Sequence, residues 1–123
     1  MKLVFVAGPY RGEGKLGEVE RNIAQSVRFQ AALAHAGVVA YSPNIHDAHW
    51  ETLNGGGEEA ARTLKVFTEW VLAEIADALA VMPGWETSAG TKTEIATATK
   101  RGIPIFYLKD ETDLTELLAW YRS

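Results

Sequence analysis

The chain has 123 residues, of which 47% are hydrophobic and 23% charged, as expected for one globular domain with its own core. Sixteen acidic and twelve basic residues give a net charge of −4, which argues against binding to a nucleic-acid polymer through its phosphate backbone. The absence of cysteine excludes disulfides, thiolate catalysis and cysteine metal ligands. We expect one domain over residues 1–123, and a soluble, cytoplasmic protein that does not contact membranes, because the sequence shows no signal-peptide pattern and no apolar run of roughly 20 residues.

Apolar runs of strand length alternate with segments of helical periodicity along the chain. In chain order they predict a strand at 2–7, a helix at 22–36, a strand at 38–41, a helix at 58–75, a strand at 78–82, a helix at 88–101, a strand at 103–108 and a helix at 114–121. The segment 44–57 lacks periodicity, ends in three glycines and is interpreted as a loop and candidate lid with at most one helical turn.

The alternation of strands and helices predicts an α/β fold. Because the strands are apolar throughout, we expect a doubly wound, flavodoxin-like parallel sheet of about four strands, with helices on both faces. A strand order of 2-1-3-4 places the switch point between the first and third strands. The loops that follow these two strands, 8–18 and 83–88, are then expected to meet in one crevice.

The loop after the third predicted strand leads into a helix that carries an acid in its first turns. Ser88 is suited to cap this helix, and Gly90 lies four residues before Glu94 on the same face, leaving space above that carboxylate. In one interpretation Glu94 is a functional carboxylate kept ionised near the positive helix end. In the other it is a solvated acid on a helix flank, and the pattern alone leaves both open.

The loop after the first strand contains Gly8-Pro-Tyr-Arg-Gly12. Its backbone amides and the Arg11 guanidinium would suit a phosphate or carboxylate, although the glycines also fit a plain turn. The run that starts at Gly12 spells G-x-G-x-x-G, but it begins beyond the strand end and no acid follows the second strand. We therefore treat that match with the dinucleotide fingerprint as accidental.

Two further features allow a role in binding. His46-Asp-Ala-His49 has no third metal ligand at a convincing spacing, so contact of His46 with a substrate is favoured over a metal site. Trp85 follows Pro83-Gly84 and would either stack on a base or seal the end of the sheet. No metal or cofactor is expected.

Three segments together resemble the nucleoside 2-deoxyribosyltransferase superfamily, which includes hydrolases of nucleoside 5′-monophosphates. They start at Phe5 (Phe-Val-Ala-Gly-Pro-Tyr-Arg-Gly), Tyr41 (Tyr-Ser-Pro-Asn-Ile-His) and Pro83 (Pro-Gly-Trp-Glu-Thr-Ser-Ala-Gly-Thr-Lys-Thr-Glu). The similarity is greatest to a small bacterial and phage branch of the superfamily. The spacing between Ser88 and Glu94 is its most specific element.

The resemblance implies a role for individual residues. Glu94 occupies the position of the carboxylate nucleophile, Ser88 and Arg11 match residues near the 5′-phosphate, and Glu69 is the nearest match to a second acid. Where relatives commonly carry a tyrosine in the first strand, this chain has Phe5, and Tyr10 is a substitute source of a hydroxyl.

The function that these features predict is N-glycosidic cleavage or transfer on a nucleoside or nucleotide, through a glycosyl-enzyme intermediate. The alternative is a binding module that holds a nucleotide in the same crevice without cleaving it. The identity of the base, the sugar and the acceptor is left open. The resemblance also implies a homodimer or larger homo-oligomer, with Trp70, Trp120 and Tyr121 as candidate interface residues.

Overall fold

A computed structural model describes all 123 residues, with the exception of the Asn54 side chain. It confirms the predicted α/β fold and strand order, because four parallel strands lie in the order β2-β1-β3-β4. The strands are β1 (Val4–Ala7), β2 (Ala40–Tyr41), β3 (Ala78–Val81) and β4 (Ile105–Tyr107). They are shorter than predicted, since several apolar residues at their ends lie in the connections.

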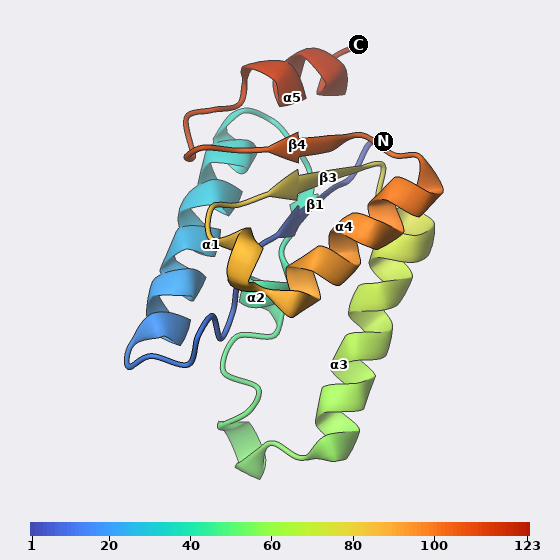
Figure 1. Ribbon diagram of the computed structural model, residues 1–123. Coiled ribbons are helices and arrows are strands. Elements are labelled where there is room, and N and C mark those ends of the chain that lie inside the picture. Colours follow the sequence, from blue (N-terminus) through green and yellow to red (C-terminus); the bar gives the residue numbers. More distant parts are fainter.

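Helices cover both faces of the sheet (Figure 1). The helices are α1 (Glu18–His35), α2 (Pro43–His46), α3 (Glu58–Trp70), α4 (Ala89–Arg101) and α5 (Thr115–Tyr121), with short turns η1 (Leu53–Gly55), η2 (Val71–Ile75) and η3 (Trp85–Thr87). Alternate residues of β1 point to opposite faces. Val4 and Val6 therefore pack with α1 and α5, whereas Phe5 and Ala7 pack with η2 and α4.

The first helix begins four residues earlier than predicted. Gly17 precedes it in the left-handed region, at φ 74°, a conformation that favours glycine. The Glu18 carboxylate then accepts hydrogen bonds from the backbone N–H groups of Glu13 and Lys15, which folds the polar loop back onto the helix start. The apolar periodicity alone does not reveal this extra turn.

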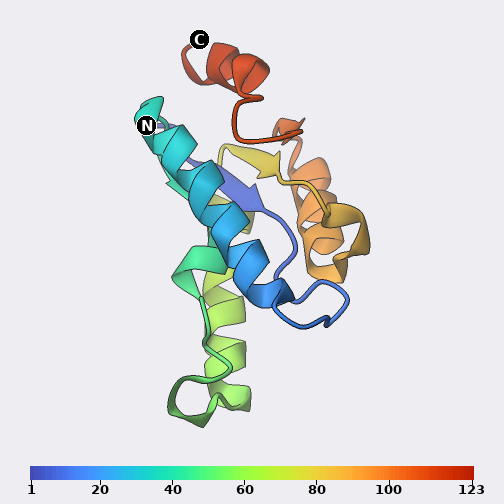
Figure 2. The ribbon, with the colours of Figure 1, turned by 90° about the vertical axis from the view of Figure 1, so that its left-hand side faces the viewer.

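The predicted helix 58–75 is divided in the structure. Its last five residues form the π-helical turn η2, and only there does the segment become buried, at Val71 and Leu72. The whole of α3 contains no buried residue, and Phe67 and Trp70 are exposed. Figures 1 and 2 show why: α3 and the segment before it extend beyond the sheet.

No helix in the described part of the chain combines the length and apolar character needed to cross a membrane. Trp120 and Tyr121, considered above for an interface, pack against their own chain. The Lys2 ammonium donates hydrogen bonds to both of their carbonyls and lies 4.9 Å from the centre of the Trp120 ring. Trp70 is therefore the most exposed aromatic of the three.

Candidate active site

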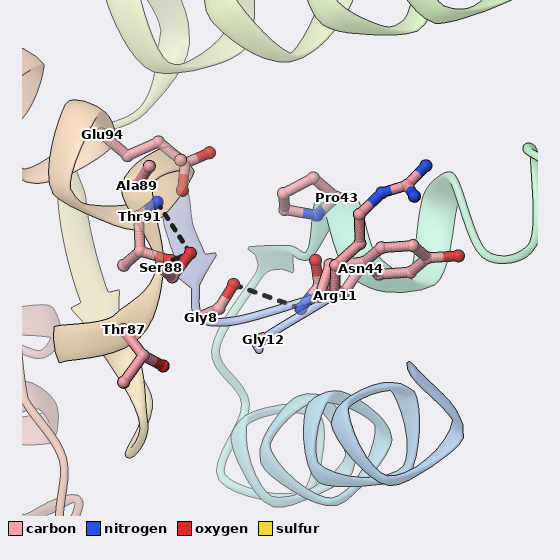
Figure 3. Close-up of a pocket in the computed structure, with 12 residues that line it drawn as sticks. Gly8, Arg11, Gly12, Pro43, Asn44, Thr87, Ser88, Ala89, Thr91 and Glu94 are labelled. Atoms are coloured by element: carbon pink, nitrogen blue, oxygen red, sulfur yellow. Dashed lines mark hydrogen bonds between the residues drawn. The ribbon is translucent and has the colours of Figure 1, made fainter. Parts of the chain in front are cut away.

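The loops that follow β1 and β3 lie on either side of one cavity of about 430 Å³, as the switch-point argument predicts. Figure 3 shows the β3–α4 side facing the β1 loop and α2 across this space. The lining residues are Gly8, Tyr10, Arg11, Gly12, Pro43, Asn44, Thr87, Ser88, Ala89, Gly90, Thr91 and Glu94. Most of the predicted site residues are among them.

Ser88 caps α4, as predicted. Its hydroxyl oxygen accepts hydrogen bonds from the backbone N–H of Thr91 at 3.2 Å and from the Thr91 hydroxyl at 2.9 Å. Since Thr91 is buried and both of these groups donate to Ser88, the Ser88 proton is left to donate to another group. Ala89 and Gly90, which supply the first backbone amides of the helix, also line the cavity. This end of the cavity suits an anion.

The capping contact of Ser88 and its expected contact with a phosphate can be separated by substitution. We expect Ser88→Ala to lower the free energy of unfolding by about 1 kcal/mol, because the helix loses its cap. Ser88→Asp should retain most of that stability, since aspartate is an equally good cap. It should nevertheless weaken binding of a 5′-monophosphate, because it places a negative charge at the anion end. Urea unfolding and calorimetric titration of both variants measure the two effects, and equal nucleotide affinity in Ser88→Asp and the parent chain would contradict the assignment.

Glu94 lies in the second turn of α4, with its carboxylate directed into the cavity (Figure 3). Burial raises the pKa of Glu94 to about 8, although part of the side chain remains accessible from the cavity. This corrects the expectation that the helix N-terminus keeps the carboxyl ionised. The influence of a helix end falls off within its first turn, so at this position desolvation is the larger effect.

Arg11 is exposed and lines the cavity on the side opposite Glu94 (Figure 3). The loop around it is folded tightly: Gly12 has φ 60°, and a side chain there would overlap the Glu18 carboxylate. Because Glu18 already accepts from the amides of Glu13 and Lys15, these two amides are not free for a ligand. The same hydrogen bonds lower the pKa of Glu18. Arg11 is therefore the side chain of this loop that is best suited to hold an anion.

Glu94 also lines a second cavity, of about 570 Å³, which extends from the first toward α3. Arg11, Pro43 and Gly90 line both cavities. Glu69 lines the second cavity but not the first, and it is exposed, with its carboxylate 3.9 Å from the Lys65 ammonium. Glu69 and Glu94 also line a further cavity of about 270 Å³. The structure thus places the two predicted acids on shared cavities, but Glu69 does not line the cavity that Ser88 lines.

Two predicted binding residues lie elsewhere. His46 is exposed, stacks on Phe67 and pairs through its ring with Asp47. Trp85 packs against Tyr107, with ring centres 5.3 Å apart, and against the core on the α4 face. Neither lines a cavity shared with Glu94 in the described structure, and Trp85 seals the end of the sheet. The described residues contain no cluster of three potential metal ligands.

The Tyr10 hydroxyl holds the segment that follows α2. It donates toward the Glu51 carboxylate, whose two oxygens lie 3.1 Å away, and accepts from the His49 N–H at 2.7 Å. Burial raises the pKa of Tyr10. Tyr10 thus lines the cavity while its hydroxyl fastens the candidate lid.

Comparison with known families gives one match. A family described as a domain of unknown function (DUF7768) matches residues 2–108. The chain belongs to this family. The matched range contains all four strands and every residue that lines the two cavities, and it ends before α5. No curated protein matches the chain.

Within this DUF7768 domain, sequence reasoning missed several residues at the site. Asn44 is buried and donates to the Pro9 carbonyl at 2.9 Å and to Ser26, joining α2 to the β1 loop. Asp47 and Trp50 line the second cavity. In the sequence, Asn44 lies in the segment from Tyr41 that supports the resemblance, and Asp47 lies in the His46-Asp-Ala-His49 cluster. Neither pattern indicates that these residues belong to the wall of a pocket.

Proposed function

We propose that the protein cleaves the N-glycosidic bond of a nucleoside or nucleoside 5′-monophosphate, by hydrolysis or by transfer to another base, and that it is a member of the nucleoside 2-deoxyribosyltransferase superfamily. The observation that carries this proposal is the position of Glu94. Its carboxylate points into a cavity that also offers the Ser88 hydroxyl and free helix amides on the same side, and Arg11 on the opposite side. A carboxylate beside an anion site fits a phosphorylated sugar.

Groups suited to an anion on both sides of the cavity support a 5′-monophosphate in preference to a free nucleoside. Ser88 has a proton to donate, the α4 N-terminus favours negative charge, and Arg11 can fork two hydrogen bonds onto phosphate oxygens. Binding energy gained at the phosphate would orient the anomeric carbon against Glu94.

The chemistry follows from a carboxylate at the anomeric carbon. The Glu94 oxygen forms a bond to that carbon as the bond to the base nitrogen breaks, and the departing base takes the electron pair and a proton from an acid. Water then forms a new bond to the anomeric carbon, releases the Glu94 carboxylate and gives up a proton. Glu69, on the neighbouring cavity, is the proposed second acid.

A second candidate function is nucleotide binding without cleavage, and two observations favour it. The raised pKa leaves Glu94 mostly protonated at pH 7, which weakens it as a nucleophile. Phe5, at the position where relatives commonly have tyrosine, is fully buried against Tyr41 and provides no hydroxyl.

Base release distinguishes the two functions. The chain is incubated with ribo- and deoxyribonucleoside 5′-monophosphates and the matching nucleosides, and free base is separated by chromatography. We expect release from at least one monophosphate, faster than from its nucleoside. A repeat with added free base detects transfer. Tight binding of an intact nucleotide with no base released would support the binding module and overturn the enzyme.

We also propose that the protein is a homo-oligomer. Val66, Phe67, Trp70 and Ile75 are exposed apolar side chains on α3 and η2, where the helix extends beyond the sheet (Figure 1). Covering such side chains is favourable in water. This supports Trp70 as an interface residue.

A further inference from the structure

The far side of the second cavity carries a carboxylate that is held in place. The Asp47 side chain is 17% exposed. One of its oxygens pairs with the His46 ring, and the other accepts from the Thr68 hydroxyl at 3.4 Å. Thr68 is in turn within hydrogen-bond distance of the Tyr41 hydroxyl, at 3.3 Å. Two neighbours therefore orient Asp47, and each carboxylate oxygen keeps acceptor capacity for a ligand.

Trp50 lies three residues further along and lines the same cavity. Its segment is fastened on both sides, because the Tyr10 hydroxyl accepts from His49 and donates to Glu51. His49 and Glu51, the residues on either side of Trp50, are thus both held by Tyr10, and Trp50 itself forms part of the cavity wall. A large ring held in this way is suited to stacking on a planar ligand.

The two cavities meet at Glu94, and this relation indicates which part of a nucleotide each one takes. If the phosphate lies at Ser88 and the anomeric carbon at Glu94, the base continues into the cavity that holds Asp47 and Trp50. That cavity shares Arg11, Pro43 and Gly90 as well as Glu94 with the first one, whereas the cavity of about 270 Å³ shares Glu94 alone. We propose that this second cavity is the base site, in which Trp50 stacks on the base and Asp47 accepts a hydrogen bond from an exocyclic amino group. The proposal rests on the proposed nucleotide substrate and adds its class: a base with an amino group.

The preference follows from the chemistry of a carboxylate. An ionised carboxylate only accepts hydrogen bonds, so an amino group satisfies it and a carbonyl oxygen at the same place repels it. A site that uses a charged acceptor in this way discriminates by about tenfold or more. Of the other two acids of this cavity, Glu94 is assigned to the anomeric carbon, and Glu69 is more exposed and faces Lys65, so it is the weaker candidate for this role.

The test compares nucleotides that differ in amino and oxo groups. Calorimetry measures the affinity of the intact chain for cytidine and uridine monophosphates, and for adenosine, guanosine and inosine monophosphates, in ribose and deoxyribose forms. Glu94→Ala is used for any nucleotide that the parent chain cleaves. In each pair that differs at one position, such as cytidine and uridine monophosphates, we expect the nucleotide with the amino group to bind at least about tenfold more tightly than the one with the oxo group.

Three variants locate the preference. Asp47→Asn should remove or reverse it, because an amide also donates a hydrogen bond. Glu86→Gln, which removes an exposed carboxyl outside both cavities, should leave the affinity ratio unchanged. Trp50→Leu should weaken both members of a pair by about the same factor, roughly tenfold. Circular dichroism verifies that each variant is folded.

The outcomes separate this inference from the proposed function. Binding with the expected preference but without base release would leave the inference standing and remove the enzyme. Cleavage with equal affinity for both members of each pair, or a preference unchanged in Asp47→Asn, would overturn the inference alone. No binding of any nucleotide would overturn both.

Discussion

Replacement of Glu94 by glutamine is expected to stabilise the folded protein at pH 9 and to have little effect at pH 4. Burial raises the pKa of Glu94 from the ordinary 4.5 to about 8, so the folded state binds this proton more tightly than the unfolded chain does. The parent chain therefore has its full stability below the unfolded pKa of 4.5, where Glu94 is protonated in both states, and it loses stability as the pH rises toward 8. Glutamine stays neutral throughout and avoids that loss.

The size of the effect is set by the difference between the two pKa values, which corresponds to at most about 5 kcal/mol. Because the cavity leaves Glu94 partly accessible to water, we expect about 2 kcal/mol. Urea unfolding of the parent chain and Glu94→Gln at pH 4, 7 and 9 measures it. Glu86→Gln, which removes an exposed carboxyl from η3, is the matched control and should behave as the parent does. If the free energy of unfolding changed with pH in the same way in the parent chain and in Glu94→Gln, the Glu94 carboxyl would not be desolvated.

The second expected result concerns turnover. Glu94→Gln should reduce base release by at least about 1000-fold, since the amide cannot act as the nucleophile. In the parent chain kcat/KM should rise about tenfold per pH unit up to about pH 8 and then level, because this parameter follows ionisation of the free enzyme.

Glu86→Gln should retain the profile of the parent chain, because this side chain is exposed and lies outside both cavities. Initial rates between pH 5 and 9.5 give the curve. Retained turnover in Glu94→Gln, or a rate that does not depend on pH below 8, would remove Glu94 from the proposed role.

Local signals predicted the fold and the two loops that form the crevice. Uninterrupted apolar strands require cover on both faces, and this determines the doubly wound sheet and the meeting of the two loops. The Ser88 cap is a contact within four residues, so it could be predicted from spacing. The position of Glu94 could be predicted in the same way, because it lies on the helix that Ser88 caps.

Features that depend on tertiary contacts could not be predicted in this way. Trp85 and Trp50 are both aromatic residues in turns, and only packing shows that the first contacts Tyr107 while the second lines a cavity. The raised pKa of Glu94 comes from groups that enclose it from several elements. The occupation of the loop amides by Glu18 depends on where α1 begins.

The most direct test of the central claim is to trap a sugar on Glu94. The chain is incubated with a 2-deoxy-2-fluoro analogue of the nucleotide it cleaves, whose fluorine slows hydrolysis of a glycosyl-enzyme by destabilising the oxocarbenium-like transition state. Protein mass spectrometry follows. The proposed mechanism predicts a mass increase equal to one sugar phosphate, located on the peptide that contains Glu94 and absent from Glu94→Gln. An adduct on another residue, or base release from the natural nucleotide without an adduct on this peptide, would contradict it.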